Sequence, residues 1–175
     1  MASTGVLAQS LPTGGAVVAG SGTIVQAGQV MTVTQASPKL ATDWQSFNIG
    51  SGSTVNFVQP SSSAVALNRV LGSDVSLIQG ALNANGQVFL VNPNGVLFTS
   101  TAQVNVGSIV ASTLAIRTAD FMSGNYRFDG SADTVGAGAA IISRGNITAT
   151  GDNGKGGSIA LIAARIIHTL SLIHI

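Results

Sequence analysis

Thr54-Val55-Asn56-Phe57 opens the stretch that decides the fold, and its alternation returns at Ala64-Val65-Ala66-Leu67 and at Asp74-Val75-Ser76-Leu77. Side chains alternate between the two faces of a strand, so each segment sets two apolar residues on one face and small or polar residues on the other. The segments begin at intervals of ten residues. This spacing predicts a repeat of short strands whose buried faces carry Val55 and Phe57, Val65 and Leu67, and Val75 and Leu77.

Turn-forming residues separate these strands. Gly, Asn, Ser and Pro dominate residues 50–53, 60–63, 83–86 and 92–95, and such residues tolerate positive φ or preset a turn. Further strands are expected at Val88 and Leu90, Val96 and Phe98, Val104 and Val106, and over 140–142, 146–148 and 158–162. Short strands at regular intervals fit a β-sandwich or a β-solenoid, and the recurrence of like residues at like positions favours the solenoid.

The composition excludes several classes of function. Only 7% of residues are charged, and the acidic residues are all aspartates, so the chain lacks the residues that cover solvated helix faces. A net charge of +1 without a basic cluster argues against a nucleic-acid partner. Cysteine is absent, and both histidines, His168 and His174, lie near the end of the chain. We therefore expect no catalytic residue, no metal and no cofactor.

Residues 118–133 interrupt the strand pattern. Phe121, Tyr126 and Phe128 stand there among small and charged residues, which indicates a loop or a hairpin outside the solenoid. Asp129 and Asp133 also lie there and are the only close carboxylate pair, the kind of pair used by glycan-cleaving enzymes. Solvated turn aspartates are the simpler interpretation. A β-helical polysaccharide-cleaving enzyme and a carbohydrate-binding adhesin module remain alternatives.

The two ends differ from the middle of the chain. Residues 1–10 are interpreted as a signal-peptide remnant, because small and modest residues at Val6-Leu7-Ala8 suit a cleavage site. Residues 167–175 are interpreted as a non-native tail, because Leu170 to Ile175 back-translates to a DNA-sequencing adaptor; a genuine apolar terminal strand is the alternative. A single domain is therefore expected over residues 11–166.

One long motif identifies a family. The segment 87–98, Gln-Val-Phe-Leu-Val-Asn-Pro-Asn-Gly-Val-Leu-Phe, resembles the hallmark of the filamentous haemagglutinin amino-terminal domain, also called the two-partner secretion domain. Residues 11–15, 43–50 and 63–70 are also similar to segments of that family, in the same order. An earlier Asn-Pro-Asn-Leu motif is missing, so the chain is more similar to the high-molecular-weight adhesin branch.

The resemblance implies an all-β fold, a right-handed parallel β-helix with an amino-terminal cap and an extra-helical hairpin excursion. It also implies export across the outer membrane of a Gram-negative bacterium, through the periplasm, to the medium or the cell surface. The implied partner is an outer-membrane β-barrel transporter of the Omp85 type, whose periplasmic POTRA domains recognise the unfolded or extended chain. A host-cell or glycan receptor would be bound by regions further along the protein, whose activity (adhesin, haemolysin or contact-dependent toxin) this sequence does not specify.

Two sets of residues are singled out. Asn92, Pro93, Asn94 and Gly95 are predicted to form a tight turn, with Pro93 fixing φ and Asn94 suited to left-handed backbone, and to contact the transporter. The large rings are predicted to fill the core or the cap; they are Trp44, Phe47, Phe57, Phe89 and Phe98.

Overall fold

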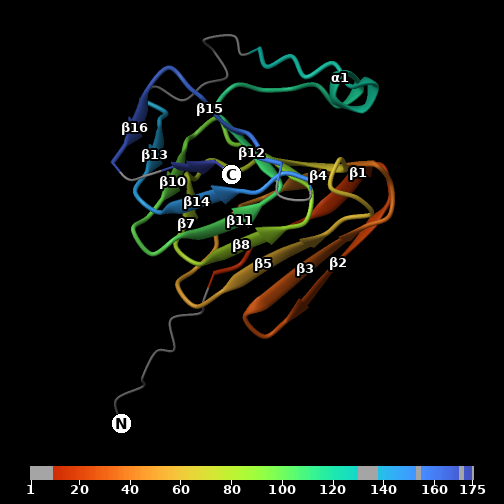
Figure 1. The fold of residues 1–175 in the computed structure, drawn as a ribbon, viewed down its shortest axis with the longest axis horizontal. Helices are drawn as coiled ribbons and strands as arrows, with labels where there is room; N and C mark the ends of the chain where they lie inside the picture. The colour runs from red at the N-terminus through yellow and green to blue at the C-terminus, as the bar shows by residue number, and fades with distance from the viewer. Residues whose placement is uncertain (1–9, 130–137, 153–154, 170–171, 175) are drawn as a thin grey trace.

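The computed structural model describes residues 10–129, 138–152, 155–169 and 172–174. Three sheets wind around one axis, which confirms the predicted parallel β-helix (Figure 1). Sheet I contains β1 (Ala16–Ala19), β4 (Lys39–Trp44), β6 (Val65–Val70), β9 (Gln87–Val91), β12 (Ser108–Ser112) and β15 (Ile159–Ile162). Sheet II contains β7 (Ser76–Ile78), β10 (Val96–Phe98), β13 (Ile141–Ser143) and β16 (Ile166–His168). Sheet III contains β2 (Gly22–Ala27), β3 (Val30–Gln35), β5 (Thr54–Val58), β8 (Ala81–Ala84), β11 (Gln103–Val106), β14 (Asn146–Ala149) and β17 (Leu172–His174).

The ten-residue repeat corresponds to the distance from one sheet to the next, not to a full turn of the helix. The chain passes from β5 in sheet III to β6 in sheet I and β7 in sheet II, and then returns to sheet III at β8. Val55 is aligned with Leu82, and Leu82 with Val104. One turn therefore takes more than two of the ten-residue intervals that the sequence displays.

The interior of the β-helix is filled by side chains that stack from turn to turn. Val55, Leu82, Val104 and Ile147 form one such column on sheet III, and all four are essentially inaccessible to solvent. Burial of these aliphatic groups is the main favourable term in the stability of the fold. The strands expected over 140–142, 146–148 and 158–162 are confirmed as β13, β14 and β15.

One of the predicted buried faces is wrong, and a second is buried on the opposite side of its sheet from the interior. In β7, Ser76 and Ile78 face the interior, whereas Val75 is 47% exposed and Leu77 is half-buried. Ser76 is aligned with Val96 and Ile78 with Phe98, and a shift of one residue moves every side chain of a strand to the other face. In β6, Val65 and Leu67 are buried, but on the outer face of sheet I and outside the helical interior.

An amino-terminal cap covers the first turn. The antiparallel hairpin of β2 and β3 precedes the parallel part of sheet III, and β1 runs antiparallel to β4 at the edge of sheet I. Trp44 and Phe47 pack edge to face beneath it, with ring centroids 5.5 Å apart. β1 and β2 are therefore the edge strands of sheets I and III at this end, and the strands next to them, β4 and β3, are paired on both sides.

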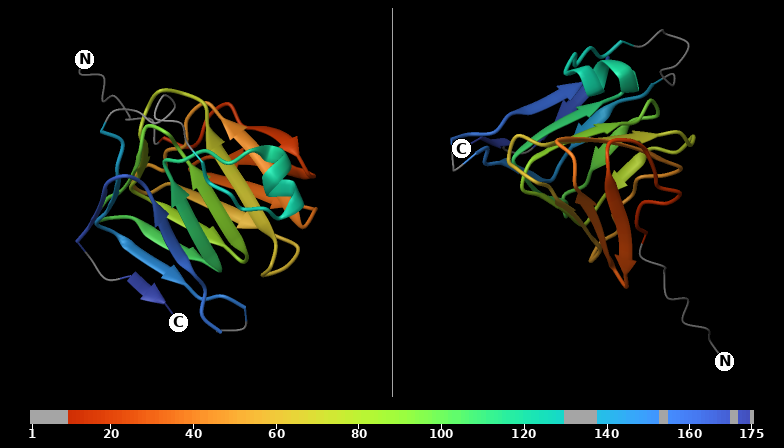
Figure 2. Two further views of the ribbon diagram at one scale, coloured as in Figure 1. Left: turned by 90° about the horizontal axis from the view of Figure 1, so that it is seen from above. Right: turned by 90° about the vertical axis from the view of Figure 1, so that its right-hand side faces the viewer.

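The interruption of the strand pattern is an excursion, which we define as residues 113–129, between β12 and β13. It carries the helix α1 (Thr118–Ser123), which lies across the outer side of sheet I (Figure 2). The predicted excursion outside the β-helix is confirmed, but it contains a short helix that was not expected, and an isolated antiparallel bridge between Ala115 and Asp129 closes it. The aromatic residues explain the difference, because packing on the sheet stabilises a short helix that could not form alone. No helix in the described part of the chain is long and apolar enough to cross a membrane.

Candidate functional site

The Asn92-Pro93-Asn94-Gly95 turn connects β9 of sheet I to β10 of sheet II. The Gly95 N–H donates to the Asn92 carbonyl oxygen at 3.0 Å, which closes a β-turn with Pro93 at its second position. The positive φ of the turn is at Gly95, at 116°. A Cβ at Gly95 would lie 2.7 Å from the Ala140 carbonyl oxygen, so both the backbone angle and the space require glycine.

Asn92 is the buried centre of this turn, with no exposed surface. Its Nδ2 donates to the Asp74 carbonyl oxygen and to Ser76 Oγ, both at 2.9 Å. Its Oδ1 accepts from the Asn94 backbone N–H at 2.9 Å and from Asn94 Nδ2 at 3.0 Å. Every strong donor and acceptor of the Asn92 amide therefore has a partner within the chain.

Asn94 joins the turn to the preceding turn of the β-helix. Its Nδ2 also donates to the Gly72 carbonyl oxygen at 2.8 Å, and its side chain is half-buried, like Pro93. Beside Asn94, a groove of about 430 Å³ lies on the outer face of sheet II, lined by Val75, Leu77, Leu97 and Ile142 among others. In the folded domain, the side-chain amides of Asn92 and Asn94 therefore form hydrogen bonds within the corner and to the preceding turn of the β-helix.

The large rings divide between two apolar clusters. Trp44, Phe47, Phe57 and Phe98 lie in the helical interior, each no more than 2% exposed. Phe89 is 4% exposed but belongs to the outer cluster, where it packs beneath the excursion. Phe89 is therefore buried by the excursion, whereas the interior rings are buried by neighbouring turns of the β-helix.

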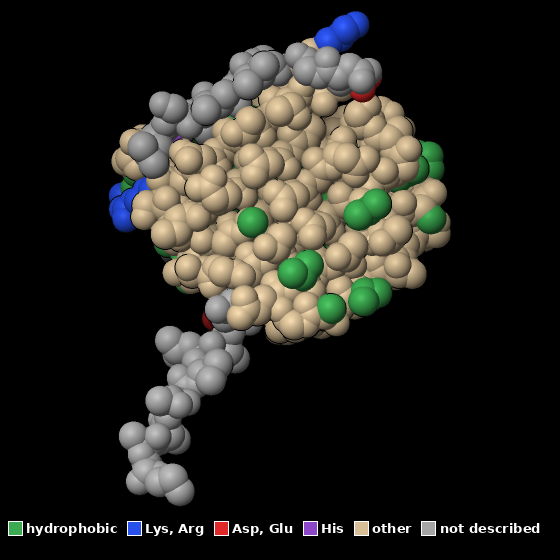
Figure 3. Space-filling view, turned by 60° about the horizontal axis from the view of Figure 1, so that its bottom comes forward, with side chains coloured by type: hydrophobic (Ala, Val, Ile, Leu, Met, Phe, Trp, Pro, Cys, Tyr) green, Lys and Arg blue, Asp and Glu red, His purple; other side chains and the backbone are tan. Residues whose placement is uncertain are grey.

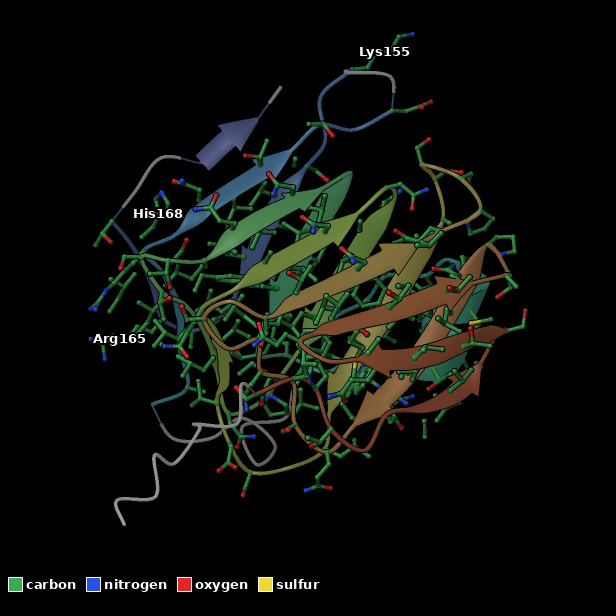
Figure 4. All side chains as sticks on the ribbon, turned by 90° about the horizontal axis from the view of Figure 1, so that it is seen from below. Lys155, Arg165 and His168 are labelled. Atoms are coloured by element: carbon green, nitrogen blue, oxygen red, sulfur yellow. The ribbon has the colours of Figure 1, made fainter. Side chains whose placement is uncertain are left out.

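Only one of the two neighbouring aspartates considered for glycan cleavage, Asp129, lies among the described residues. Asp129 pairs with Arg127 at 3.3 Å, and both side chains are largely exposed; Asp133 lies outside the described residues. Within the described part of the chain, no three His, Cys, Asp or Glu side chains gather as a metal site. Lys155, Arg165 and His168 project from separate points of the surface (Figure 4). The face seen in Figure 3 carries only small, separated hydrophobic patches.

The outer cluster was missed by the sequence analysis. It joins Ala41, Val65, Leu67, Phe89 and Val91 of sheet I to Ile116 and Phe121 of the excursion. A signal was present, because Val88 to Val91 is a continuous apolar run, as expected for a strand covered on both faces. The period-two pattern alone accounts for only one of those faces.

Comparisons with known proteins agree with one another. The family model described as "TPS secretion domain" matches residues 8–173. The crystal structure of the HMW1 secretion domain from Haemophilus influenzae superposes with a TM-score of 0.82 and 32% identity, over 90% of this chain and 40% of that one. Two Heme/hemopexin-binding proteins of H. influenzae are similar: one, from strain Rd, is 46% identical over 106 residues and the other 47% over 98. Those matches cover 61% and 56% of this chain but 12% and 11% of the relatives' length.

Proposed function

The chain belongs to the TPS secretion domain family, and we propose that it directs a larger protein to an outer-membrane β-barrel transporter of the Omp85 type. In this proposal the transporter's periplasmic POTRA domains bind the chain while it is extended. The chain then crosses the outer membrane and folds outside as the first turns of a β-helix. The role of the domain is recognition and folding, not catalysis.

The proposal rests on the hydrogen bonds that the side-chain amides of Asn92 and Asn94 form within the folded turn. Asn92 is fully buried and its amide is saturated by Asp74, Ser76 and Asn94. Asn94 is committed to Gly72 and Asn92. In the folded corner, both N–H donors of the Asn92 amide are already bonded, and only part of the Asn94 side chain reaches the surface. A partner that forms hydrogen bonds with these amides must therefore bind before the corner forms. This supports recognition of an extended chain.

The stacking of the turns supports folding during export. Each strand of sheets I to III after the cap pairs with its equivalents in the adjacent turns, so each new turn can bury its apolar side chains on the one already formed. Early burial with mostly neighbouring partners avoids the loop-closure entropy that delays distant contacts. Progressive folding outside the cell would then oppose return of the chain through the transporter.

The larger protein is proposed to be secreted or displayed on the surface of a Gram-negative bacterium after transit through the periplasm. The relatives are named for binding heme and hemopexin, but this chain spans only about an eighth of their length. Binding of heme, hemopexin, a host cell or a glycan is therefore assigned to regions outside this domain.

Deletion of residues 11–166 from the full-length protein tests the proposal. Secretion into the medium and display on the surface should both be lost, with the protein held in the cell. Asn94→Ala should reduce secretion more than Asp152→Ala, because Asp152 lies on the loop after β14, away from the Asn92–Gly95 turn. Normal secretion of the deletion variant would contradict the proposal.

A further inference from the structure

β6 and β9 are apolar on both faces, which a strand of the helical interior does not require. In β11 the burial pattern alternates, with Val104 and Val106 buried and Gln103 and Asn105 exposed. In β6 the inward positions are filled by Ala66, Asn68 and Val70, and Val65 and Leu67 point outward on the same face as Arg69. In β9, Phe89 and Val91 point outward as well. Both strands therefore turn two large apolar side chains away from the interior.

A single later segment covers this outer side. Phe89 is surrounded by the rings of Tyr126 at 5.0 Å and of Phe121 and Phe128, each at 5.9 Å between centroids. Phe121 has no exposed surface. All the covering rings belong to the excursion, so Val65, Leu67, Phe89 and Val91 become exposed together in any state in which the excursion is not docked. We call these four residues the outer apolar face.

Besides its rings, the excursion packs on sheet I through Ile116 and Met122, and one charged side chain of the sheet reaches it. The Lys39 ammonium donates to the Met122 carbonyl oxygen at 3.0 Å near the end of α1 and lies 5.8 Å from the centroid of the Tyr126 ring. α1 has six residues, and its N-cap residue, Arg117, makes no capping hydrogen bond through its side chain. A helix this short is not stable alone, so docking and helix formation depend on each other. Undocking of the excursion would therefore also unfold α1.

We propose that the outer apolar face of β6 and β9 is the surface that the transporter's periplasmic domains hold, and that docking of the excursion on the same face ends this interaction. The inference rests on the proposed function. Residues 65–91 precede the excursion in the chain, and β9 leads directly into the Asn92–Gly95 turn, so a partner on β9 of the extended chain would also reach the asparagine amides before the corner forms. The partner would offer an apolar groove or a sheet edge with apolar pockets, because alternate side chains of an added strand are read in that way.

Three Phe→Ala variants test the proposal, each removing one buried ring. Phe121→Ala removes a ring of the cover, Phe89→Ala a ring of the outer apolar face, and Phe98→Ala a ring of the interior. Binding to the purified periplasmic domains of the cognate transporter would be measured for each folded chain and for each chain held unfolded in urea. The stability of each variant would be measured alongside, so that binding can be compared at equal populations of the unfolded state.

Phe121→Ala should raise the affinity of the folded chain by roughly tenfold or more, because it shifts the excursion toward the undocked state. Phe89→Ala should bind more weakly than wild type in the urea-held state, whereas Phe98→Ala should match wild type there. If all three variants bind in proportion to their unfolded populations, the inference fails and recognition of the extended chain stands. If the urea-held wild-type chain does not bind the periplasmic domains, the proposed function itself fails.

Discussion

The indole Nε1 of Trp44 donates a hydrogen bond to Oδ1 of Asn68 at 3.0 Å, and both side chains face the interior of the β-helix. Asn68 has no exposed surface, and its Nδ2 donates to the carbonyl oxygens of Ala66 and Phe89 at 3.3 Å. One amide thus connects the only tryptophan of the chain to two strands of sheet I. A buried polar group in this position is tolerated because each of its hydrogen bonds has a partner.

Asn68→Leu should lower the free energy of unfolding by about 1–3 kcal/mol, because it leaves the buried Trp44 N–H without an acceptor. Urea denaturation followed by Trp44 fluorescence would measure the change. Asn105→Leu is the control: Asn105 lies on the exposed face of sheet III, bonded to Asn83 at 3.4 Å, and its replacement should cost less than about 0.5 kcal/mol. Equal losses in the two variants would contradict the role given to Asn68.

The Asn92–Gly95 turn should show a graded response to substitution. Asn92→Ala should lower the free energy of unfolding by about 1–3 kcal/mol, because the Asp74 carbonyl and the Asn94 N–H lose a buried partner. Asn94→Ala should cost about 1 kcal/mol, since its side chain is half-buried and water can replace part of its bonding. Urea denaturation of each purified variant would give the order, and a larger loss for Asn94→Ala would contradict it.

Gly95→Ala tests the backbone of the same turn. An alanine would hold a φ of 116° and place its Cβ against the Ala140 carbonyl oxygen, at a cost of about 1–3 kcal/mol. Gly28→Ala is the matched control, because Gly28 also has a positive φ, at 58°, but an added Cβ would meet no atom within 4 Å. Thermal unfolding should show a larger decrease in Tm for Gly95→Ala, and equal decreases would contradict the cost assigned to the backbone angle and the Ala140 contact at Gly95.

The strands and their fold class were predictable because the interior imposes a simple requirement on the sequence. Most inward positions are apolar, so pairs such as Val55 and Phe57 or Val104 and Val106 alternate visibly along the chain. The turns were predictable for a similar reason, since Gly95 stands where the backbone and the neighbouring turn permit no side chain. Both constraints act within short segments, so the residue types of each segment are enough to predict them.

The features that were mispredicted depend on which strands lie side by side. Alternation does not reveal which of two faces is inward, and Val75 and Leu77 were therefore assigned to the wrong side of β7. It also cannot show that Phe89 is buried by Phe121, Tyr126 and Phe128 rather than by the interior. Likewise, the role of Asn92 depends on Asp74 and Ser76, which belong to the preceding turn of the β-helix.

Lys39→Met should loosen the excursion without disturbing the interior. The substitution keeps most of the apolar stem but removes the charge-assisted bond to the Met122 carbonyl oxygen and the contact with the Tyr126 ring. The free energy of local opening should fall by about 1 kcal/mol. Hydrogen exchange would measure this at amides of residues 121–127, with amides of β11 unchanged. Lys155→Met, on an exposed loop, should leave both regions unchanged.

Docking of the excursion should weaken at high pH. Partial burial against Phe89 and Phe121 raises the pKa of Tyr126 above its ordinary value of 10.0, because the tyrosinate is less well solvated there. An acid whose folded pKa is raised contributes full stability below the unfolded pKa, and this contribution falls as pH rises above about 10 toward the folded value.

Tyr126 is the only tyrosine, so its absorbance can be followed directly as a function of pH. The midpoint should lie above 10.0 in the wild type and return toward 10.0 in Phe121→Ala, since that variant exposes the ring. A wild-type midpoint at or below 10.0, or one that Phe121→Ala does not move, would show that the excursion does not shield Tyr126 in solution.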